Sequence, residues 1–355
     1  MIVSNQAISM NTIRIGIVGL GANTRLRHVP GLRACEDVEI VGVCNRQAES
    51  TAAAAREFDI PQTYERWEDL VDDENIDAVM IGTWPYLHCP ITLAALEAGK
   101  HVLVEARMAM NAAEAREMLA ASEAHADLVT QIVPSPFGLR AGTVLKEMLD
   151  DGYIGDLREV LLCGANDSLA TSDAPLHWRQ VAEYSGLNML MLGILHETLI
   201  RWVPDPLRVM AQTHAFTAER VDPAGGQLRQ VGTPDSVQVL TELPGGARGI
   251  YHISGAIHFG PGMQVQLCGS DGTIWYDLTN DCLSAARVGE ESLQEIPIPP
   301  EKEGRWRVEE EFINAIRAEE QVRLTDFATG VRYMEFTEAV VRSAAEGIAV
   351  RLREA

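Results

Sequence analysis

The stretch "TIRIGIVGLGANT", residues 12–24, decides the fold. Its first part is β-branched and almost continuously apolar, as strands buried on both faces of a parallel sheet are. Two glycines follow, Gly19 and Gly21, where the chain must turn from the strand into a helix. Gly19 permits a tight turn, and Gly21 lets another molecule approach the backbone closely because glycine has no side chain.

Strands and helices alternate through the part of the chain that follows. We predict further strands at residues 38–45, 77–83, 101–106 and 128–133, and helices at residues 46–58, 88–99 and 111–125. Such alternation is typical of right-handed β-α-β units that build a doubly wound parallel sheet. The sequence therefore predicts an α/β Rossmann domain over residues 12–133, with a ligand site beyond the carboxyl ends of its strands.

The glycine turn lies at that edge of the predicted sheet. Backbone N–H groups at the start of the following helix can bind a diphosphate, which is how dinucleotides are held in such folds. The pattern predicts NAD(P) binding by the turn residues Gly19, Gly21, Ala22, Asn23 and Thr24. The alternative is a tight strand–helix turn that binds no ligand.

The second predicted strand ends in Asn45 and Arg46, about 20 residues after the glycines, where an Asp or Glu would select NAD. Asn45 removes the repulsion that a carboxylate would exert on a 2′-phosphate, and Arg46 could pair with that phosphate. These residues favour NADP as the cofactor, with NAD as the alternative. The alternative for Arg46 is a solvated residue in the first turn of a helix.

The composition limits the class of protein. The chain has 355 residues, enough for two domains, and a net charge of −22, which disfavours nucleic acid and anionic membrane surfaces as partners. None of the six cysteines forms a CxxC pair or joins a histidine at metal-ligand spacing, so we expect no metal site and reduced thiols in a cytoplasmic protein. We also expect no signal peptide and no membrane-spanning segment.

Several segments together resemble the Gfo/Idh/MocA family of oxidoreductases, named for glucose–fructose oxidoreductase, inositol dehydrogenase and a rhizopine-catabolism protein. They are "RIGIVGLG" at 14–21, "RHVPGL" at 27–32, "IDAVMIGTWPYLH" at 76–88 and "ITLAALEAGKHVLVEA" at 91–106. The resemblance implies a Rossmann domain followed, over residues 134–355, by an α/β domain with a large open mixed, mainly antiparallel sheet. It also implies NAD(P)-dependent hydride transfer at a hydroxyl or carbonyl of a sugar, polyol or sugar acid.

Alternating patterns in the second half of the chain accommodate such a sheet. We predict strands at residues 158–166, 207–216, 235–243, 246–257 and 263–278, and a hairpin turn at "ELPGGARG", 242–249. The open face of such a sheet usually packs against a second copy, since an apolar face is unfavourable in water. We therefore expect a homodimer or homotetramer.

The chain departs from the family at positions to which the resemblance assigns proton transfer. A lysine and a proline follow the family's loop glutamate, whereas Ala106 and Arg107 follow Glu105 here. We predict a helix over residues 185–203, where three family residues (Asp, His and Asp) would share one helix face. The matching positions carry no such groups and hold Met191, Leu195 and Thr198.

Other residues could replace the missing proton-transfer groups. His196 lies about 100° round the helix from Leu195, and its alternative role is that of a core or domain-interface histidine. His177, in the loop 173–186, has a suitable intrinsic pKa, and its alternative is a surface cluster on a packed loop. Glu105 could border the nicotinamide pocket, transfer a proton or form a structural salt bridge.

The remaining site residues are predicted from their positions in the chain. Thr83, Trp84, Pro85 and His88 are expected, with Glu105, near the ribose and nicotinamide of the cofactor. Ordinary hydrophobic filling is the alternative for Trp84, and a structural role at a helix start is the alternative for His88. The predicted substrate contacts are Arg107, Arg179, Tyr184 and Asn188.

The sequence thus predicts an NAD(P)-dependent oxidoreductase with displaced acid–base residues and a small, polar substrate. Arginine is a poor base because it stays protonated, so Arg107 is expected to anchor substrate rather than move a proton. Two alternatives stay open. One is a dinucleotide-binding sensor or interaction subunit without redox turnover, and the other is a lyase or glycosidase that recycles a hydride.

Overall fold

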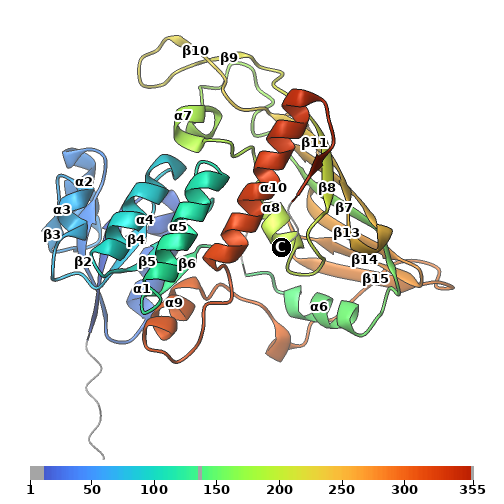
Figure 1. Ribbon diagram of the computed structural model, residues 1–355, viewed down its shortest axis with the longest axis horizontal. Helices are drawn as coiled ribbons and strands as arrows, with labels where there is room; N and C mark the ends of the chain where they lie inside the picture. The colour runs from blue at the N-terminus through green and yellow to red at the C-terminus, as the bar shows by residue number, and fades with distance from the viewer. Residues whose placement is uncertain (1–11, 135–137, 353–355) are drawn as a thin grey trace, which may run out of the picture. The chain divides into compact units, whose positions relative to one another are not determined.

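The computed structural model describes residues 12–134 and 138–352, which form two compact units (Figure 1). Among the described residues, the first unit comprises 12–105, 117–133 and 307–327, and the second comprises 106–116, 134–306 and 328–352. The chain passes from the first unit to the second between residues 133 and 134, among other points. Residues 307–327, far along the chain, also belong to the first unit.

The first unit contains a six-stranded parallel sheet with the order β3-β2-β1-β4-β5-β6. Its strands are β1 (Ile13–Val18), β2 (Val38–Cys44), β3 (Gln62–Thr63), β4 (Ala78–Ile81), β5 (His101–Val104) and β6 (Thr130–Ile132). The strand order reverses at β1, which has β2 on one side and β4 on the other. The predicted doubly wound sheet is therefore confirmed, and its crevice lies at the carboxyl ends of these three strands.

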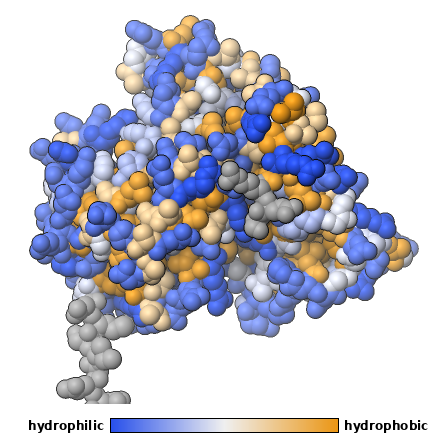
Figure 2. Space-filling view, viewed as in Figure 1, coloured by the Kyte–Doolittle hydropathy of each residue, from blue (hydrophilic) through white to orange (hydrophobic). Residues whose placement is uncertain are grey.

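Helices connect the strands of the first unit, as the sequence predicts. They are η1 (Thr24–His28), α1 (Val29–Ala34), α2 (Ala48–Glu57), α3 (Trp67–Val71), η2 (Pro85–Leu87), α4 (His88–Glu97) and α5 (Ala112–Ala124). The helix α9 (Val308–Ile316) also belongs to this unit, although it lies far along the chain from these strands. The α5 helix begins in the second unit and continues in the first. Around α2 and α3 the surface is largely hydrophilic (Figure 2), as the high net charge leads one to expect.

The second unit contains a nine-stranded sheet with the order β16-β15-β14-β13-β7-β12-β11-β8-β17. Only β7 and β12 pair in parallel, so the predicted mixed, mainly antiparallel sheet is confirmed. Its strands are β7 (Leu157–Ala165), β8 (Arg208–His214), β11 (Ser236–Glu242), β12 (Arg248–Ser254), β13 (Gly262–Gly269), β14 (Gly272–Asp277), β15 (Cys282–Arg287), β16 (Gln294–Glu295) and β17 (Val350–Arg351). A separate two-stranded sheet joins β9 (Glu219–Val221) to β10 (Leu228–Gln230).

Two sequence predictions need correction in this unit. The single strand expected at 263–278 is a hairpin of β13 and β14, because the chain turns between Gly269 and Gly272. The helix expected over 185–203 is reduced to α8 (Leu192–Leu199), since Leu190 adopts a left-handed conformation with φ +46°. A short helix, α7 (Ala182–Ser185), precedes it. The hairpin turn predicted at 242–249 is confirmed, and it contains η4 (Pro244–Gly246).

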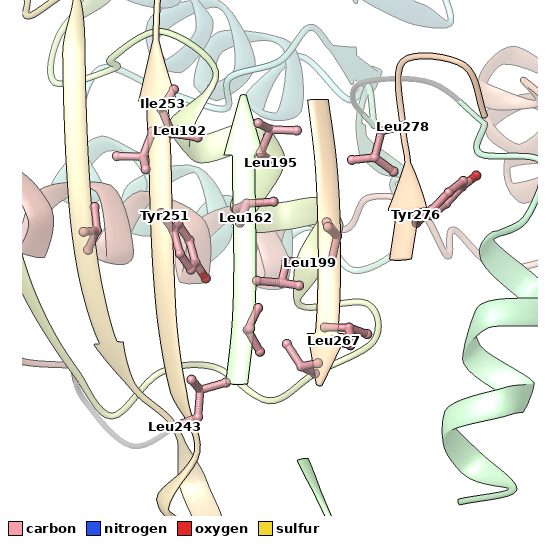
Figure 3. Close-up of a cluster of buried hydrophobic side chains, with 14 of the residues drawn as sticks. Leu162, Leu192, Leu195, Leu199, Leu243, Tyr251, Ile253, Leu267, Tyr276 and Leu278 are labelled. Atoms are coloured by element: carbon pink, nitrogen blue, oxygen red, sulfur yellow. The ribbon is translucent and has the colours of Figure 1, made fainter. Parts of the chain in front are cut away.

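The core of the second unit lies against one face of the large sheet. Leu192, Leu195 and Leu199 of α8 pack over β7 and β12 (Figure 3), and Phe336 and Val340 of α10 (Phe327–Glu346) belong to the same buried cluster. The remaining helices are α6 (Gly142–Asp150), η3 (Trp178–Gln180) and η5 (Pro300–Lys302). Within the part of the chain that the structure describes, no helix combines the length and apolar character needed to span a bilayer.

The other face of the large sheet exposes an apolar row. Met210 of β8, Leu240 of β11 and Ile250 of β12 lie in register, with Leu240 paired to both neighbours. Their exposed fractions are 49%, 56% and 49%, respectively. Their neighbours along the strands, such as Val239 and Tyr251, point into the core, so alternation along each strand produces this row.

Candidate functional site

The glycine turn has the geometry that the sequence predicts. Gly19 has φ +88°, and a Cβ at this position would lie 2.6 Å from the backbone nitrogen of Thr83. Gly21 donates its N–H to the carbonyl of Gly19 at 2.9 Å, and a Cβ on Gly21 would meet only the carbonyl of Gly82, at 3.7 Å. Gly19 is therefore required by the turn itself, whereas Gly21 leaves open space beside the backbone.

The residues after the glycines begin the helix. Ala22 and Asn23 are helical, and they precede η1. Thr24, where the glycine pattern often has its third glycine, is 1% exposed and donates its hydroxyl to the carbonyl of Gly19 at 3.2 Å. The side chain of Thr24 thus stabilises the turn from inside.

A cleft of about 670 Å³ lies at the carboxyl ends of β1, β2 and β4. This volume is in the range of small-molecule binding sites. The predicted cofactor residues that line it are Gly19, Gly21, Asn45, Arg46, Thr83 and Trp84. The predicted residues that do not line it are Ala22, Asn23, Thr24, Pro85, His88 and Glu105.

The side chain of Asn45 forms hydrogen bonds with two backbone groups. Its Oδ1 accepts the N–H of Leu20 at 2.7 Å, and its Nδ2 donates to the carbonyl of Ser50 at 3.1 Å. The amide therefore ties the end of β2 to the glycine turn. The end of β2 thus carries an amide where an Asp or Glu would repel a 2′-phosphate.

Three arginines line the cleft, and their environments differ. Arg25 forms an ion pair with Glu57, and a guanidinium nitrogen of Arg66 lies 3.3 Å from Oε1 of Glu68. Arg46 instead lies over the ring of Trp84, with its Cζ 5.2 Å from the ring centroid. Among the described residues, no carboxylate lies within ion-pair distance of Arg46, so this guanidinium is available to an anionic ligand.

Part of the lining of the cleft was not predicted from the sequence. Residues 65–68 line the cleft because they follow β3. That strand has only two residues, so no hydrophobic pattern predicts it, and the residues after it could not be placed at the sheet edge. Tyr86 and Leu87 line the cleft next to the predicted segment 83–85.

His88 and Pro85 are buried in the two helices that follow Trp84. His88 is the first residue of α4, is fully buried, and its Nε2 lies 3.0 Å from the carbonyl of Thr83. Pro85 is buried at the start of η2. These contacts favour the structural role for His88 that the sequence left as the alternative.

Glu105 follows β5 and lies in a cluster that the sequence did not reveal. His28 is fully buried, with Nε2 3.0 Å from Glu105 and Nδ1 2.5 Å from Glu309 of α9, and Asn23 donates to the same oxygen of Glu105. Burial disfavours the charged ring, but the hydrogen bonds to both glutamates outweigh it and raise the pKa of His28 to about 9. Burial acts to raise the pKa of Glu105, but the hydrogen bond and charge of His28 prevail and lower it.

Arg107 and Asn188 bind backbone groups within the second unit. Arg107 is 5% exposed and donates to the carbonyl of Leu190, and Asn188, 4% exposed, donates to the carbonyls of Ala109 and Ser185. Asn188 precedes α8 and is therefore not part of a helix, although it falls within the helix predicted over residues 185–203. Both side chains hold the loop after Glu105 against residues 185–190.

His177, Arg179 and Tyr184 occupy the loop before α8. His177 is exposed and caps η3, where its Nδ1 accepts the N–H of Arg179 at 3.2 Å. Partial desolvation and then the charge of Arg179 lower the pKa of His177. The guanidinium of Arg179 lies 4.3 Å from the ring of Trp178, and Tyr184 in α7 is half-buried.

His196 lies in the core of the second unit. It is fully buried, stacks on Phe336 with ring centroids 3.6 Å apart, and its Nδ1 lies 3.1 Å from the hydroxyl of Tyr251. Burial lowers its pKa despite the nearby carboxylate of Asp205. This environment favours the core role over proton transfer. Nor does any group of three or more His, Cys, Asp or Glu within residues 12–134 and 138–352 form an arrangement suited to a metal ion.

The strand order, the glycine turn and the cleft are those of a dinucleotide-binding Rossmann domain, and comparison with protein-family models agrees. Residues 13–132 match the model described as an oxidoreductase family with an NAD-binding Rossmann fold. Residues 143–275 match the GFO/IDH/MocA C-terminal domain. The chain therefore belongs to the Gfo/Idh/MocA family of oxidoreductases.

Relatives and solved structures agree with this placement. The chain is 32% identical over 246 residues to a trans-1,2-dihydrobenzene-1,2-diol dehydrogenase from Mus musculus, a match that covers 68% of each chain. It resembles an oxidoreductase domain protein from Kribbella flavida with a TM-score of 0.87 and 22% identity, over 97% of this chain and 100% of the other. It resembles levoglucosan dehydrogenase, solved with NADH and L-sorbose, with a TM-score of 0.85 and 22% identity, over 96% and 99% of the two chains. At these identities the two structures support the fold alone.

Proposed function

We propose that the protein is an NADP-dependent dehydrogenase or reductase that acts on a hydroxyl or carbonyl of a sugar, polyol, sugar acid or related diol. The observation that carries the proposal is the cleft at the switch point of the sheet, which Gly19, Gly21 and Arg46 all line. The diol dehydrogenase from Mus musculus supports the substrate class, since it shares 32% identity with this chain.

The residues of the cleft fit a dinucleotide. Gly21 leaves room for a diphosphate beside the backbone, and the helix that begins at Ala22 presents N–H groups to it. Arg46 would pair with a 2′-phosphate, and Trp84 would support both the guanidinium and the ribose. When bound, the cofactor supplies the hydride acceptor or donor; the protein binds, orients and excludes water.

The experiment that tests the cofactor assignment compares Arg46→Ala with Arg56→Ala. Arg56 is exposed on α2 and does not line the cleft, so its loss removes the same charge elsewhere. We expect R46A to weaken NADP⁺ binding in calorimetry about 10- to 100-fold, the size of a charge-assisted hydrogen bond, and to change NAD⁺ binding little. If R46A and R56A weaken both nucleotides equally, NADP selection by Arg46 is wrong.

Turnover separates the enzymatic proposal from its two alternatives. Sugars, polyols and cyclic diols are incubated with the protein and NADP⁺ or NAD⁺, and reduced nicotinamide is followed by its absorbance. Net reduction supports the dehydrogenase. Tight nucleotide binding without turnover on the whole panel favours a sensor or interaction subunit, and cleaved products without net change of cofactor favour a lyase or glycosidase with a recycled hydride.

We also propose that the exposed face of the large sheet is the contact of a homodimer or homotetramer. The row of Met210, Leu240 and Ile250 supports this, because soluble monomers rarely leave neighbouring large apolar residues exposed in register. An isologous contact would pair the row with its own copy.

A further inference from the structure

The fully buried His28 does not line the cofactor cleft, yet it contacts Glu105. We propose that His28 is a positioning residue whose ring, held between the carboxylates of Glu105 and Glu309, fixes Glu105 as a permanent anion at the end of β5. The inference rests on the proposed function in one respect, since Glu105 is taken to lie near the nicotinamide ring. The arrangement around His28 can be tested without that assumption.

Both nitrogens of the His28 ring contact a carboxylate oxygen. Nδ1 lies 2.5 Å from Oε1 of Glu309, and Nε2 lies 3.0 Å from Oε1 of Glu105. A neutral imidazole has one N–H and one acceptor nitrogen, and an ionised carboxylate can only accept. Two ionised carboxylates therefore require the imidazolium, which donates one hydrogen bond to each.

Three distant segments build this arrangement. Glu309 lies in the first turn of α9, where the helix dipole favours a negative charge. Gly31 of α1 makes room for it, because a Cβ on Gly31 would lie 2.5 Å from Oε2 of Glu309. Asn23 donates to the same oxygen of Glu105 that His28 contacts, so this carboxylate is held from two directions.

The cluster of His28, Glu105 and Glu309 carries one positive and two negative charges, and hence a net charge of −1. An oxidised nicotinamide ring is positively charged and a reduced one is neutral, so an anion beside the ring favours the oxidised cofactor. A carboxylate held ionised in this way is also unsuited to release or take up protons near neutral pH. Glu105 would act through its charge and not as the acid or base of the reaction.

Other ionisable groups face this cluster. The charge of His88 on α4 acts on Glu105, and the charge of Glu309 acts on the thiol of Cys35 at the end of α1. Arg317 and Glu310 also act on Cys35 from the α9 side. Burial raises the pKa of Cys35, so this thiol stays neutral through the pH range considered below.

The first test measures the protonation of His28 directly by NMR of ¹⁵N-labelled histidine, with His28→Gln used to assign the signal. We expect an imidazolium at pH 7.5, because the pKa of His28 is raised to about 9. Glu309→Gln removes one carboxylate. Gly31→Ala pushes the Glu309 carboxylate away without replacing any of the three charged residues. Both variants should therefore lower the pKa of His28. A neutral His28 ring at pH 7 in the unaltered protein would overturn the proposal.

The second test measures the affinities for oxidised and reduced cofactor by calorimetry between pH 5.5 and 8. In the unaltered protein we expect their ratio to stay constant, since the net charge of the cluster does not change in this range. Glu105→Gln should reduce the preference for the oxidised form about tenfold. His28→Gln leaves two carboxylates without their cation, so the pKa of one should rise and the ratio should become pH-dependent.

His101→Gln is the matched control. His101 is the first residue of β5, the strand that ends just before Glu105. It is half-buried, and its Nδ1 accepts the N–H of Val129 at 2.9 Å. The His101→Gln variant should be less stable, with no change in the affinity ratio for oxidised and reduced cofactor or in its pH profile. A flat profile in folded H28Q, equal to that of the unaltered protein, would refute the positioning role. Failure of the unaltered protein to bind either nucleotide would instead refute the proposed function, and the NMR test would still decide the state of His28.

Discussion

A single methyl group should lower stability at Gly19 and cofactor affinity at Gly21, the two glycines of the turn. At Gly19 the φ of +88° and the 2.6 Å approach to the nitrogen of Thr83 both oppose a side chain. The left-handed backbone costs about 1–3 kcal/mol, and the clash with a backbone atom costs about 1–3 kcal/mol more. Gly19→Ala should therefore lower the free energy of unfolding by about 2–6 kcal/mol, a large part of the stability of a typical domain.

Gly21→Ala should leave the fold intact and weaken cofactor binding. The new Cβ would lie at an ordinary van der Waals distance, 3.7 Å, from the carbonyl of Gly82 and meet nothing closer. Its effect on stability should be within about 1 kcal/mol. A diphosphate held against the backbone would be pushed away, at a cost of about 1.5–3 kcal/mol in hydrogen bonds to charged oxygen, or about 10- to 100-fold in affinity.

Urea denaturation and calorimetry with NADP⁺ distinguish these effects, and Gly99→Ala is the control. Gly99 has φ +73° at the end of α4, and a Cβ added there would meet nothing within 4 Å, so its replacement isolates the cost of the backbone conformation. G19A should be less stable than G99A by the cost of the clash. Full NADP⁺ affinity in G21A would show that the diphosphate does not lie against this turn, and unchanged stability in G19A would refute the steric argument.

Three further outcomes follow from the structure. Leu240→Arg, on the exposed sheet face, should shift the protein to monomers in light scattering with little loss of stability, whereas an unchanged mass would exclude this face as the contact. Phe336→Ala removes the ring stacked on His196 and should lower the free energy of unfolding by about 3–5 kcal/mol in denaturant titrations, a value under about 1 kcal/mol arguing against the assigned packing. Because the pKa of His28 is raised to about 9, the protonated ring should stabilise the fold fully below the unfolded pKa of about 6.5. This stabilisation should be lost as the pH rises through about 9. The melting temperature should therefore fall over this interval in the unaltered protein and not in His28→Gln.

Local pattern predicted the first unit well, because a parallel strand is a continuous apolar run and the glycine turn follows it directly. Thr24 and Asn45 illustrate what such a pattern leaves out. Their places were expected, but their side chains bind the backbone of the turn, a contact that depends on how β1 and β2 lie together. The two-residue strand β3 has no pattern at all, and the cleft residues after it were missed for that reason.

The second unit shows why an apolar run can mislead. Residues 185–203 are rich in leucine and methionine, which favour helix, yet the helix begins only at Leu192. Gly186 has φ +62° and Leu190 has φ +46°, and these left-handed residues break the run although leucine itself gives no signal of it. Asn188 consequently lies before the helix and binds backbone carbonyls.

Long-range contacts were beyond any local pattern. His28 and Glu309 are 281 residues apart in the chain, and their hydrogen bond could not be inferred from either segment. The nearest signal in the sequence was Gly31, three residues after His28, a glycine in a helix where alanine would be more stable. Such a residue indicates a close neighbour without identifying it.

The energetics of the two histidines proposed for proton transfer differ in a way that favours His177. His196 would have to leave its stack on Phe336 and its contact with Tyr251, in a core where exposing or emptying one site costs several kcal/mol. His177 is exposed, and its Nδ1 accepts the N–H of Arg179, so the neutral ring carries its proton on Nε2. To accept a second proton, His177 needs only to release that N–H, a bond worth about 0.5–1.5 kcal/mol. This cost is small beside an enzymatic barrier, and its lowered pKa keeps the ring neutral and able to accept a proton at neutral pH.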